Sequence, residues 1–144
     1  MSCRSVGALA LTGTYLMKPL RIAVALLSLS TAAGAQTAKV TPLFTHDLPD
    51  ITGKEGMILT VEYPPGGTNP VHRHNANVFV YVLEGSIVMQ VKGEDAVTLH
   101  AGQTFYEAPN DVHLVGRNAS KTEPAKFLAF FVKDKGAPPV VPAE

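Results

Sequence analysis

Three histidines are the residues of this chain whose type and spacing point to chemistry. His72 and His74 form an H-x-H pair, and His113 lies further along the chain. Alternate side chains of a β-strand share a face, so His72 and His74 are expected to point the same way. Neutral imidazole is a common ligand of first-row transition metals, and such a pair can supply two adjacent coordination positions. Taken alone, an H-x-H pair is also common at partly buried or surface positions, and that alternative stays open here.

The same alternation continues into an apolar stretch. Val78, Val80 and Val82 have the parity of the two histidines, so they are expected to line the same face. Imidazoles beside an apolar wall suit a metal at the bottom of a dry cavity.

The elements that must position these residues are short β-rich runs separated by turn residues such as Pro64-Pro65-Gly66-Gly67. No long stretch keeps apolar residues at the helical spacing, so the sequence predicts an all-β protein. The expected strands are Thr41–Asp47, Gly56–Tyr63, Val71–His74, Asn77–Glu84, Ser86–Val91, Ala96–Leu99, Thr104–Glu107, Val112–Gly116 and Lys126–Lys133.

Two groups of residues resemble the sequence motifs of the cupin superfamily. The first motif, G-x5-H-x-H-x3-4-E-x6-G, is matched by Gly66, His72, His74 and Gly85, and the second more loosely by Gly102, Pro109, His113 and Asn118. The resemblance covers about residues 55–132. It implies an antiparallel jelly-roll β-barrel, the double-stranded β-helix, with a metal or ligand inside its mouth.

The chain departs from the first motif at one position. Where the motif has glutamate this chain has Val78, which carries no donor atom, so the resemblance implies a metal site of three histidines: His72, His74 and His113. Glu107, at the end of an expected strand, is the candidate replacement carboxylate. Facing inward, it could be a fourth ligand or a general base with a pKa raised by burial. Facing outward, it is a solvated strand end.

Other candidates are expected to be structural. Arg73 should point to the face opposite the two histidines, and Asn118 should fix a turn through its side-chain amide. His46 and His100 are interpreted as structural histidines. Phe79 and Tyr81 should lie on the face opposite Val78 and Val80, packed against a second sheet or against a dimer partner, and together with the resemblance they suggest a homodimer.

The charge balance and the N-terminal sequence indicate which partners and which cellular compartment to expect. The 144 residues carry 12 Lys+Arg and 12 Asp+Glu, and this balance argues against nucleic acid as a partner. Residues 1–35 read as a leader, with 1–16 an upstream extension and 17–35 a signal peptide that starts at Met17 and ends in Ala33-Gly34-Ala35. Its apolar run is too short for a stable membrane anchor.

Removing the leader takes away Cys3 and leaves nine basic and twelve acidic residues, a net charge of −3. The predicted organisation is therefore a leader, a cupin barrel over residues 36–135 and a Pro-rich tail over 136–144, which cannot be a central strand. The protein is expected to be exported, to the periplasm or the medium.

The functional hypothesis is a protein that binds a divalent transition metal (Fe, Mn, Zn, Ni or Cu) and a small organic molecule. By resemblance it is an oxidoreductase of the quercetinase or diketone-cleaving dioxygenase type, or an isomerase or lyase. The first alternative is a non-catalytic module that binds metal or a small molecule. The second is a metal-free, epimerase-like site in which the histidines act as acid and base.

Overall fold

The computed structural model describes residues 37–143, which form ten β-strands and no helix. The strands are β1 (Lys39–Asp47), β2 (Lys54–Tyr63), β3 (His72–Arg73), β4 (Ala76–Glu84), β5 (Ser86–Val91), β6 (Val97–His100), β7 (Thr104–Glu107), β8 (Val112–Asn118), β9 (Ala125–Asp134) and β10 (Val141–Pro142). The predicted leader, residues 1–35, lies outside the described residues.

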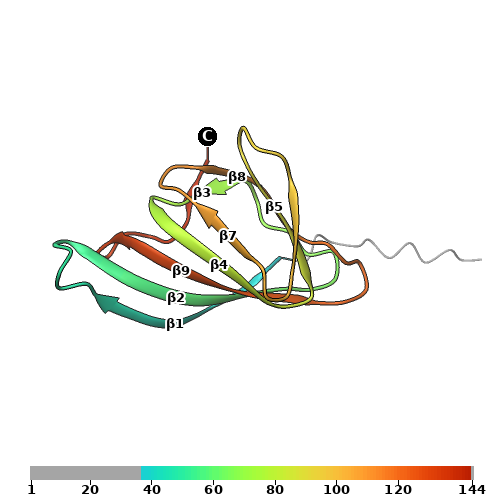
Figure 1. Cartoon of the computed structure of the whole chain (residues 1–144), viewed down its shortest axis with the longest axis horizontal. Helices are drawn as coiled ribbons and strands as arrows, with labels where there is room; N and C mark the ends of the chain where they lie inside the picture. The colour runs from blue at the N-terminus through green and yellow to red at the C-terminus, as the bar shows by residue number, and fades with distance from the viewer. Residues whose placement is uncertain (1–36, 144) are drawn as a thin grey trace, which may run out of the picture. The chain divides into compact units, whose positions relative to one another are not determined.

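The strands form two five-stranded sheets whose named pairings are all antiparallel. One sheet has the order β1-β2-β9-β4-β7 and the other β10-β3-β8-β5-β6. Figure 1 shows β1, β2, β9 and β4 side by side, with the shorter strands of the second sheet facing them. Strands distant in sequence are therefore neighbours in both sheets, as in a jelly roll, and the predicted all-β fold class is confirmed.

The core lies between the two sheets. Buried and more exposed side chains alternate along β4 and β9, and the buried ones point toward the other sheet. Val78, Val80 and Val82 are at most 2% exposed, whereas Phe79 and Tyr81 point outward and are almost half exposed. On β9, residues from Ala125 to Phe131 alternate in the same way, and Ile87 and Met89 of β5 meet them from the other sheet. The expected inward valines and outward aromatics are confirmed, while the homodimer stays a prediction.

The predicted strand bounds agree with the structure to within two residues, apart from one missed element. The segment after β9 was expected not to form a central strand, and it forms the short edge strand β10, paired with β3. Pro142 is tolerated there because an edge strand can leave one side of its ladder unpaired.

Asn118 fixes a turn, as predicted. Its side-chain amide donates to the carbonyl oxygens of Pro64 (3.0 Å) and Glu123 (2.8 Å), and its Oδ1 accepts from the Ser120 backbone N–H at 2.8 Å. The residue is 3% exposed, so its hydrogen bonds are shielded from water. Asn118 thereby ties together two loops at the end of β8 and does not face the histidines.

Candidate metal centre

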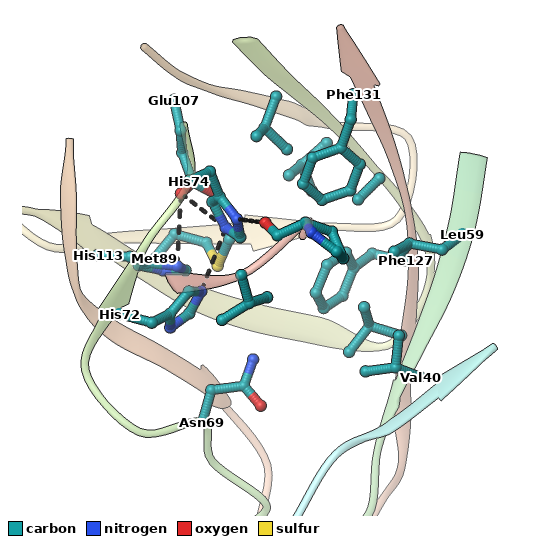
Figure 2. Close-up of a pocket in the computed structure, with 16 residues that line it drawn as sticks. Val40, Leu59, Asn69, His72, His74, Met89, Glu107, His113, Phe127 and Phe131 are labelled. Atoms are coloured by element: carbon teal, nitrogen blue, oxygen red, sulfur yellow. Dashed lines mark hydrogen bonds and ion pairs between the residues drawn. The ribbon is translucent and has the colours of Figure 1, made fainter. Parts of the chain in front are cut away.

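The fold brings the three predicted histidines together. His72 lies on β3 and His113 on β8, and the two are direct partners in the antiparallel register. His74 follows β3 at the same parity as His72. All three are buried, with exposed fractions between 3% and 7%, and one ring nitrogen from each lies within 4.8 Å of the others (Figure 2).

Backbone carbonyl groups hold two of the rings in a defined tautomer. Nδ1 of His72 lies 2.8 Å from the carbonyl oxygen of Pro70, and Nδ1 of His74 lies 2.5 Å from that of Pro139. A carbonyl can only accept, so each Nδ1 carries the hydrogen, and in the neutral ring Nε2 is then an unprotonated donor atom.

These two Nε2 atoms face one another across 3.2 Å. Two nitrogen ligands about 2.1 Å from one ion are about 3.0 Å apart at a right angle and about 3.4 Å apart at the tetrahedral angle. The spacing therefore fits two ligands of one metal ion, whereas two bare lone pairs at that distance repel each other.

His113 supplies the third donor. Both of its ring nitrogens are buried and have no hydrogen-bond partner among residues 37–143. An unsatisfied buried polar atom costs free energy, about 1–3 kcal/mol per group, unless something binds it. The residues present thus fit a divalent transition metal by donor type, spacing and unmet bonding capacity.

Glu107 faces the histidines and is not a solvated strand end. On β7 it is the direct register partner of Val78, the position at which the family motif has its glutamate. Opposite residues of an antiparallel pair project from the same face, so β7 brings a carboxylate to the side where β4 lacks one. Its Oε2 lies 3.5 Å from Nε2 of His74 and 3.5 Å from Nδ1 of His113 (Figure 2).

Burial sets the protonation of this group of residues. It raises the pKa of Glu107 to about 7, with a smaller contribution from Asp111. It lowers the pKa of both His74 and His113 to about 4, helped by the neighbouring His72. At neutral pH these two histidines are therefore uncharged and able to ligate, while Glu107 is poised to hold or release a proton.

The raised pKa of Glu107 predicts a specific pH dependence of stability in the metal-free protein. Between pH 4.5 and 7 the folded state keeps a proton that the unfolded state loses, so this contribution falls as pH rises, by up to about 3 kcal/mol. His74 and His113 act in the opposite direction, since their lowered pKa values make stability rise between pH 4 and 6.5.

Urea unfolding after chelator treatment, at steps from pH 4.5 to 7.5, measures these contributions. Glu107→Gln should lack the stabilisation that protonated Glu107 gives at low pH. The free energy of unfolding of the wild type, relative to that of this variant, should therefore decrease as pH rises. Parallel pH profiles of the two proteins would show that Glu107 is not protonated in the folded state.

The histidines and Glu107 form one end of a mostly apolar cavity. Its empty space, including the open mouth, is about 490 Å³. Its apolar lining comes from both sheets and consists of Val40, Leu59, Val61, Val78, Val80, Met89, Phe127, Ala129, Phe131, Pro139 and Val140. Val82, expected in this wall, is instead fully buried in the core outside the cavity lining. Among residues 37–143, the only other polar side chain in the lining is that of Asn69.

The remaining candidates lie where the sequence placed them. The Arg73 guanidinium points away from the histidines and donates to Asn110 at 3.2 Å. His46 stacks on Phe44 on the edge strand, and His100 is paired with Ser86 on β6, both at exposed positions.

Sequence reasoning missed the Pro139 carbonyl and the inner face of β9. Every residue has a carbonyl group, so nothing in the sequence marks Pro139 as the acceptor for His74. Phe127, Ala129 and Phe131 do alternate with less buried residues, and that signal could have placed them in the cavity wall.

A scan against protein families supplies the deciding observation, since residues 59–131, just over half of the chain, match the model described as the cupin domain. The chain is a cupin. Among curated protein sequences, none matches this cupin.

Solved structures share the cupin's fold. A cupin-like protein from Thermotoga maritima is 21% identical, with a TM-score of 0.58 over 74% of this chain and 75% of that one. The DMSP lyase DddQ from Ruegeria pomeroyi is 22% identical, with a TM-score of 0.53 over 60% of this chain and 42% of that one. An oxalate oxidase in complex with the substrate analogue glycolate is 26% identical, with a TM-score of 0.56 over 72% and 54%. This cupin thus spans less than two thirds of the lyase and of the oxidase.

No helix long and apolar enough to cross a bilayer occurs in the described part of this cupin.

Proposed function

We propose that this cupin is an exported protein that binds a divalent transition metal through His72, His74 and His113 and acts on a small organic substrate. The observation that carries the proposal is the pair of Nε2 atoms of His72 and His74, left without a hydrogen by two backbone carbonyls, beside a third histidine whose buried ring nitrogens make no hydrogen bond. A bound metal would supply Lewis acid or redox chemistry at this end of the cavity.

The apolar walls favour a small, partly apolar substrate. Among residues 37–143 no lysine or arginine lines the cavity, and the one carboxylate, Glu107, would repel a second negative charge. A neutral or singly charged molecule with a metal-binding oxygen therefore suits the site better than a dianion. Aromatic and valine side chains would exclude water from it.

Glu107 is the candidate catalytic residue. A carboxyl group with a pKa of about 7 can take a proton from a substrate and return it at neutral pH. Proton transfer of this kind suits a lyase or an isomerase, and the same residue as a fourth ligand would suit dioxygenase-like chemistry. The likeness to the lyase shows the shared fold, and the likeness to the oxidase, at 26% identity, supports an enzymatic use of a barrel of this kind.

Elemental analysis of protein purified without chelator tests metal binding directly. We expect close to one equivalent of one transition metal per chain, either as purified or after reconstitution. Less than a tenth of an equivalent under both conditions would contradict the proposal. Stoichiometric metal without turnover of any oxygen-containing test substrate would instead favour a non-catalytic binding module.

Glu107→Gln tests the role of the carboxylate while keeping the side-chain volume. We expect a 10- to 100-fold weaker metal affinity, about the effect of removing a group that supports a metal site. We expect the affinity of the wild type to increase between pH 6 and 8, where metal binding would release the Glu107 proton, and the variant should lack this increase.

Competition with a chromophoric chelator at several pH values measures both effects. The exposed carboxylate variant Glu94→Gln is the matched control and should behave as the wild type. Unchanged affinity together with an unchanged pH profile in Glu107→Gln would assign Glu107 a purely structural role.

Export is proposed from the sequence of residues 1–35. The basic start, the short apolar run and the Ala33-Gly34-Ala35 ending are typical of a cleaved signal peptide. Intact-mass measurement of the protein recovered from the periplasm or medium should give a chain that begins at Gln36. An uncleaved chain in the cytoplasmic fraction would contradict export.

A further inference from the structure

We propose that residues 137–143, called here the closing segment, are a working part of the metal site. The segment orients His74 through the Pro139 carbonyl and completes the cavity wall with Val140. Pro139 is thus a positioning residue, acting through its backbone. The inference rests on the proposed metal function but adds a part of the chain that none of the cupin motifs includes.

The path of the closing segment brings it to the histidines from outside the barrel motifs. The chain leaves β9 at Asp134, turns with Ala137 N–H donating to the Asp134 carbonyl at 3.0 Å, and then reaches the edge of the other sheet. There Val141 pairs with Arg73 and Pro142 with His72, so β10 adds to the strand that carries a proposed ligand. Between these two points Pro139 and Val140 line the cavity.

The contact with His74 decides which nitrogen of that ring can bind a metal. The hydrogen bond from Nδ1 to the Pro139 carbonyl, at 2.5 Å, keeps the hydrogen on Nδ1 and leaves Nε2 bare. The other groups around the ring are Phe131, in an edge contact, and Glu107 and His72, which both face Nε2. Without the closing segment, the ring would be free to carry its hydrogen on Nε2, which blocks that nitrogen as a ligand.

His72 provides an internal comparison. Its Nδ1 bonds to the carbonyl of Pro70, two residues earlier, so although β10 pairs with β3 at His72, the bond that sets the His72 tautomer does not involve the closing segment. Loss of the closing segment should therefore change His74 and leave His72 as it is. A general loosening of the fold would change both.

A buried ion pair anchors the start of the closing segment. Lys133 on β9 and Glu55 on β2 are register partners, and the residues are 3% and 7% exposed. The Lys133 ammonium donates to the Glu55 carboxylate and, at 2.7 Å, to the carbonyl of Ala137. Buried charges are costly unless their bonding capacity is met, and Ala137 meets part of that need. The hydrogen bond from Lys133 to the Ala137 carbonyl therefore holds the start of the closing segment against β9.

The first test uses the metal-free protein and does not depend on metal binding. The full chain is compared with a chain that ends at Ala137, which keeps the bond to Lys133, and with a control chain that ends at Pro142. Long-range ¹H–¹⁵N correlation spectra report the tautomer of each histidine ring. We expect His74 to carry its hydrogen on Nδ1 in the full chain and in the control, and to lose that preference in the shorter chain, with His72 unchanged.

The second test measures Zn²⁺ affinity and release by chelator competition on the same three proteins. The chain ending at Ala137 should bind 10- to 100-fold more weakly and release Zn²⁺ faster, as expected when the hydrogen-bond partner of a ligand is lost. Identical His74 signals, or an affinity within twofold of the full chain, would overturn the inference. If the full chain binds neither Zn²⁺ nor any other divalent transition metal, the proposed function fails, while the tautomer experiment still tests the contact between His74 and Pro139.

A second variant covers the case in which the shorter chain does not fold. The double substitution Pro138→Gly and Pro139→Gly keeps the carbonyl but makes the undocked segment more flexible, which favours the undocked state. A mixed His74 tautomer and a severalfold weaker Zn²⁺ affinity are expected. Wild-type behaviour in both measurements would contradict a role for docking of the segment.

Discussion

The variant His113→Ala is expected to lose stoichiometric metal binding. His113 is the sole proposed ligand from β8, and its removal leaves His72 and His74 as a two-donor site on one strand and its following loop. Loss of a group that merely supports a ligand lowers metal affinity 10- to 100-fold, so loss of the ligand itself should cost on the order of 100-fold or more. Elemental analysis and chelator competition measure the result.

The matched control for this variant is His46→Ala. His46 is an exposed histidine on β1, away from the cavity, so its removal should leave the metal content unchanged. Thermal unfolding of both metal-free variants shows whether the fold survives. Full metal stoichiometry in folded His113→Ala would show that the metal site lies elsewhere.

The second large effect is a loss of folding stability, which we expect for Gly85→Ala. Gly85 joins β4 to β5 with φ of +69°, a left-handed conformation that costs an L-residue about 1–2 kcal/mol. An added Cβ would also lie 2.5 Å from the Pro124 carbonyl oxygen and 3.0 Å from Cα of Ala125. Both contacts are with backbone, which cannot rotate away, so overpacking adds about 1–3 kcal/mol.

Gly93→Ala separates the two contributions. Gly93 also has a positive φ, +93°, but an added Cβ meets no atom within 4 Å. Gly93→Ala should therefore lose only the conformational contribution, and Gly85→Ala should be the less stable variant by about 1–3 kcal/mol. In a domain of this size that difference corresponds to roughly 5–20 °C in Tm, measurable by calorimetry. Equal Tm values would mean that the backbone near Pro124 moves to accommodate the added Cβ without loss of stability.

The sequence allowed the inner face of β4 and the H-x-H pair to be predicted because both depend on the two-residue period of a strand. The period places His72 and His74 on one face and Val78 and Val80 on another shared face, while the meeting of these faces in one cavity comes from the packing of β3 and β4, which belong to different sheets. Turn residues likewise marked most strand ends, since glycine and proline act on the local backbone. The prediction that Asn118 fixes a turn was confirmed for the same local reason.

Glu107 shows where such reasoning stopped. The sequence alone did not decide whether Glu107 points inward or outward. Turns flank β7 on both sides, and they do not determine how its residues line up with those of β4. The register pair of Val78 and Glu107 decided the matter, and a shift of one residue would have turned the carboxylate to solvent.

The sequence by itself thus determined an all-β chain with two histidines on one face, a third on a later strand and an apolar face on the strand that carries Val78 and Val80. These properties follow from residue type and local periodicity. Only the tertiary structure decided that Glu107 lies opposite Val78 with its carboxylate near His74 and His113, and that the Pro139 carbonyl accepts from Nδ1 of His74. Both depend on strand register and on contacts between distant segments, for which a backbone carbonyl or a single carboxylate leaves no local pattern.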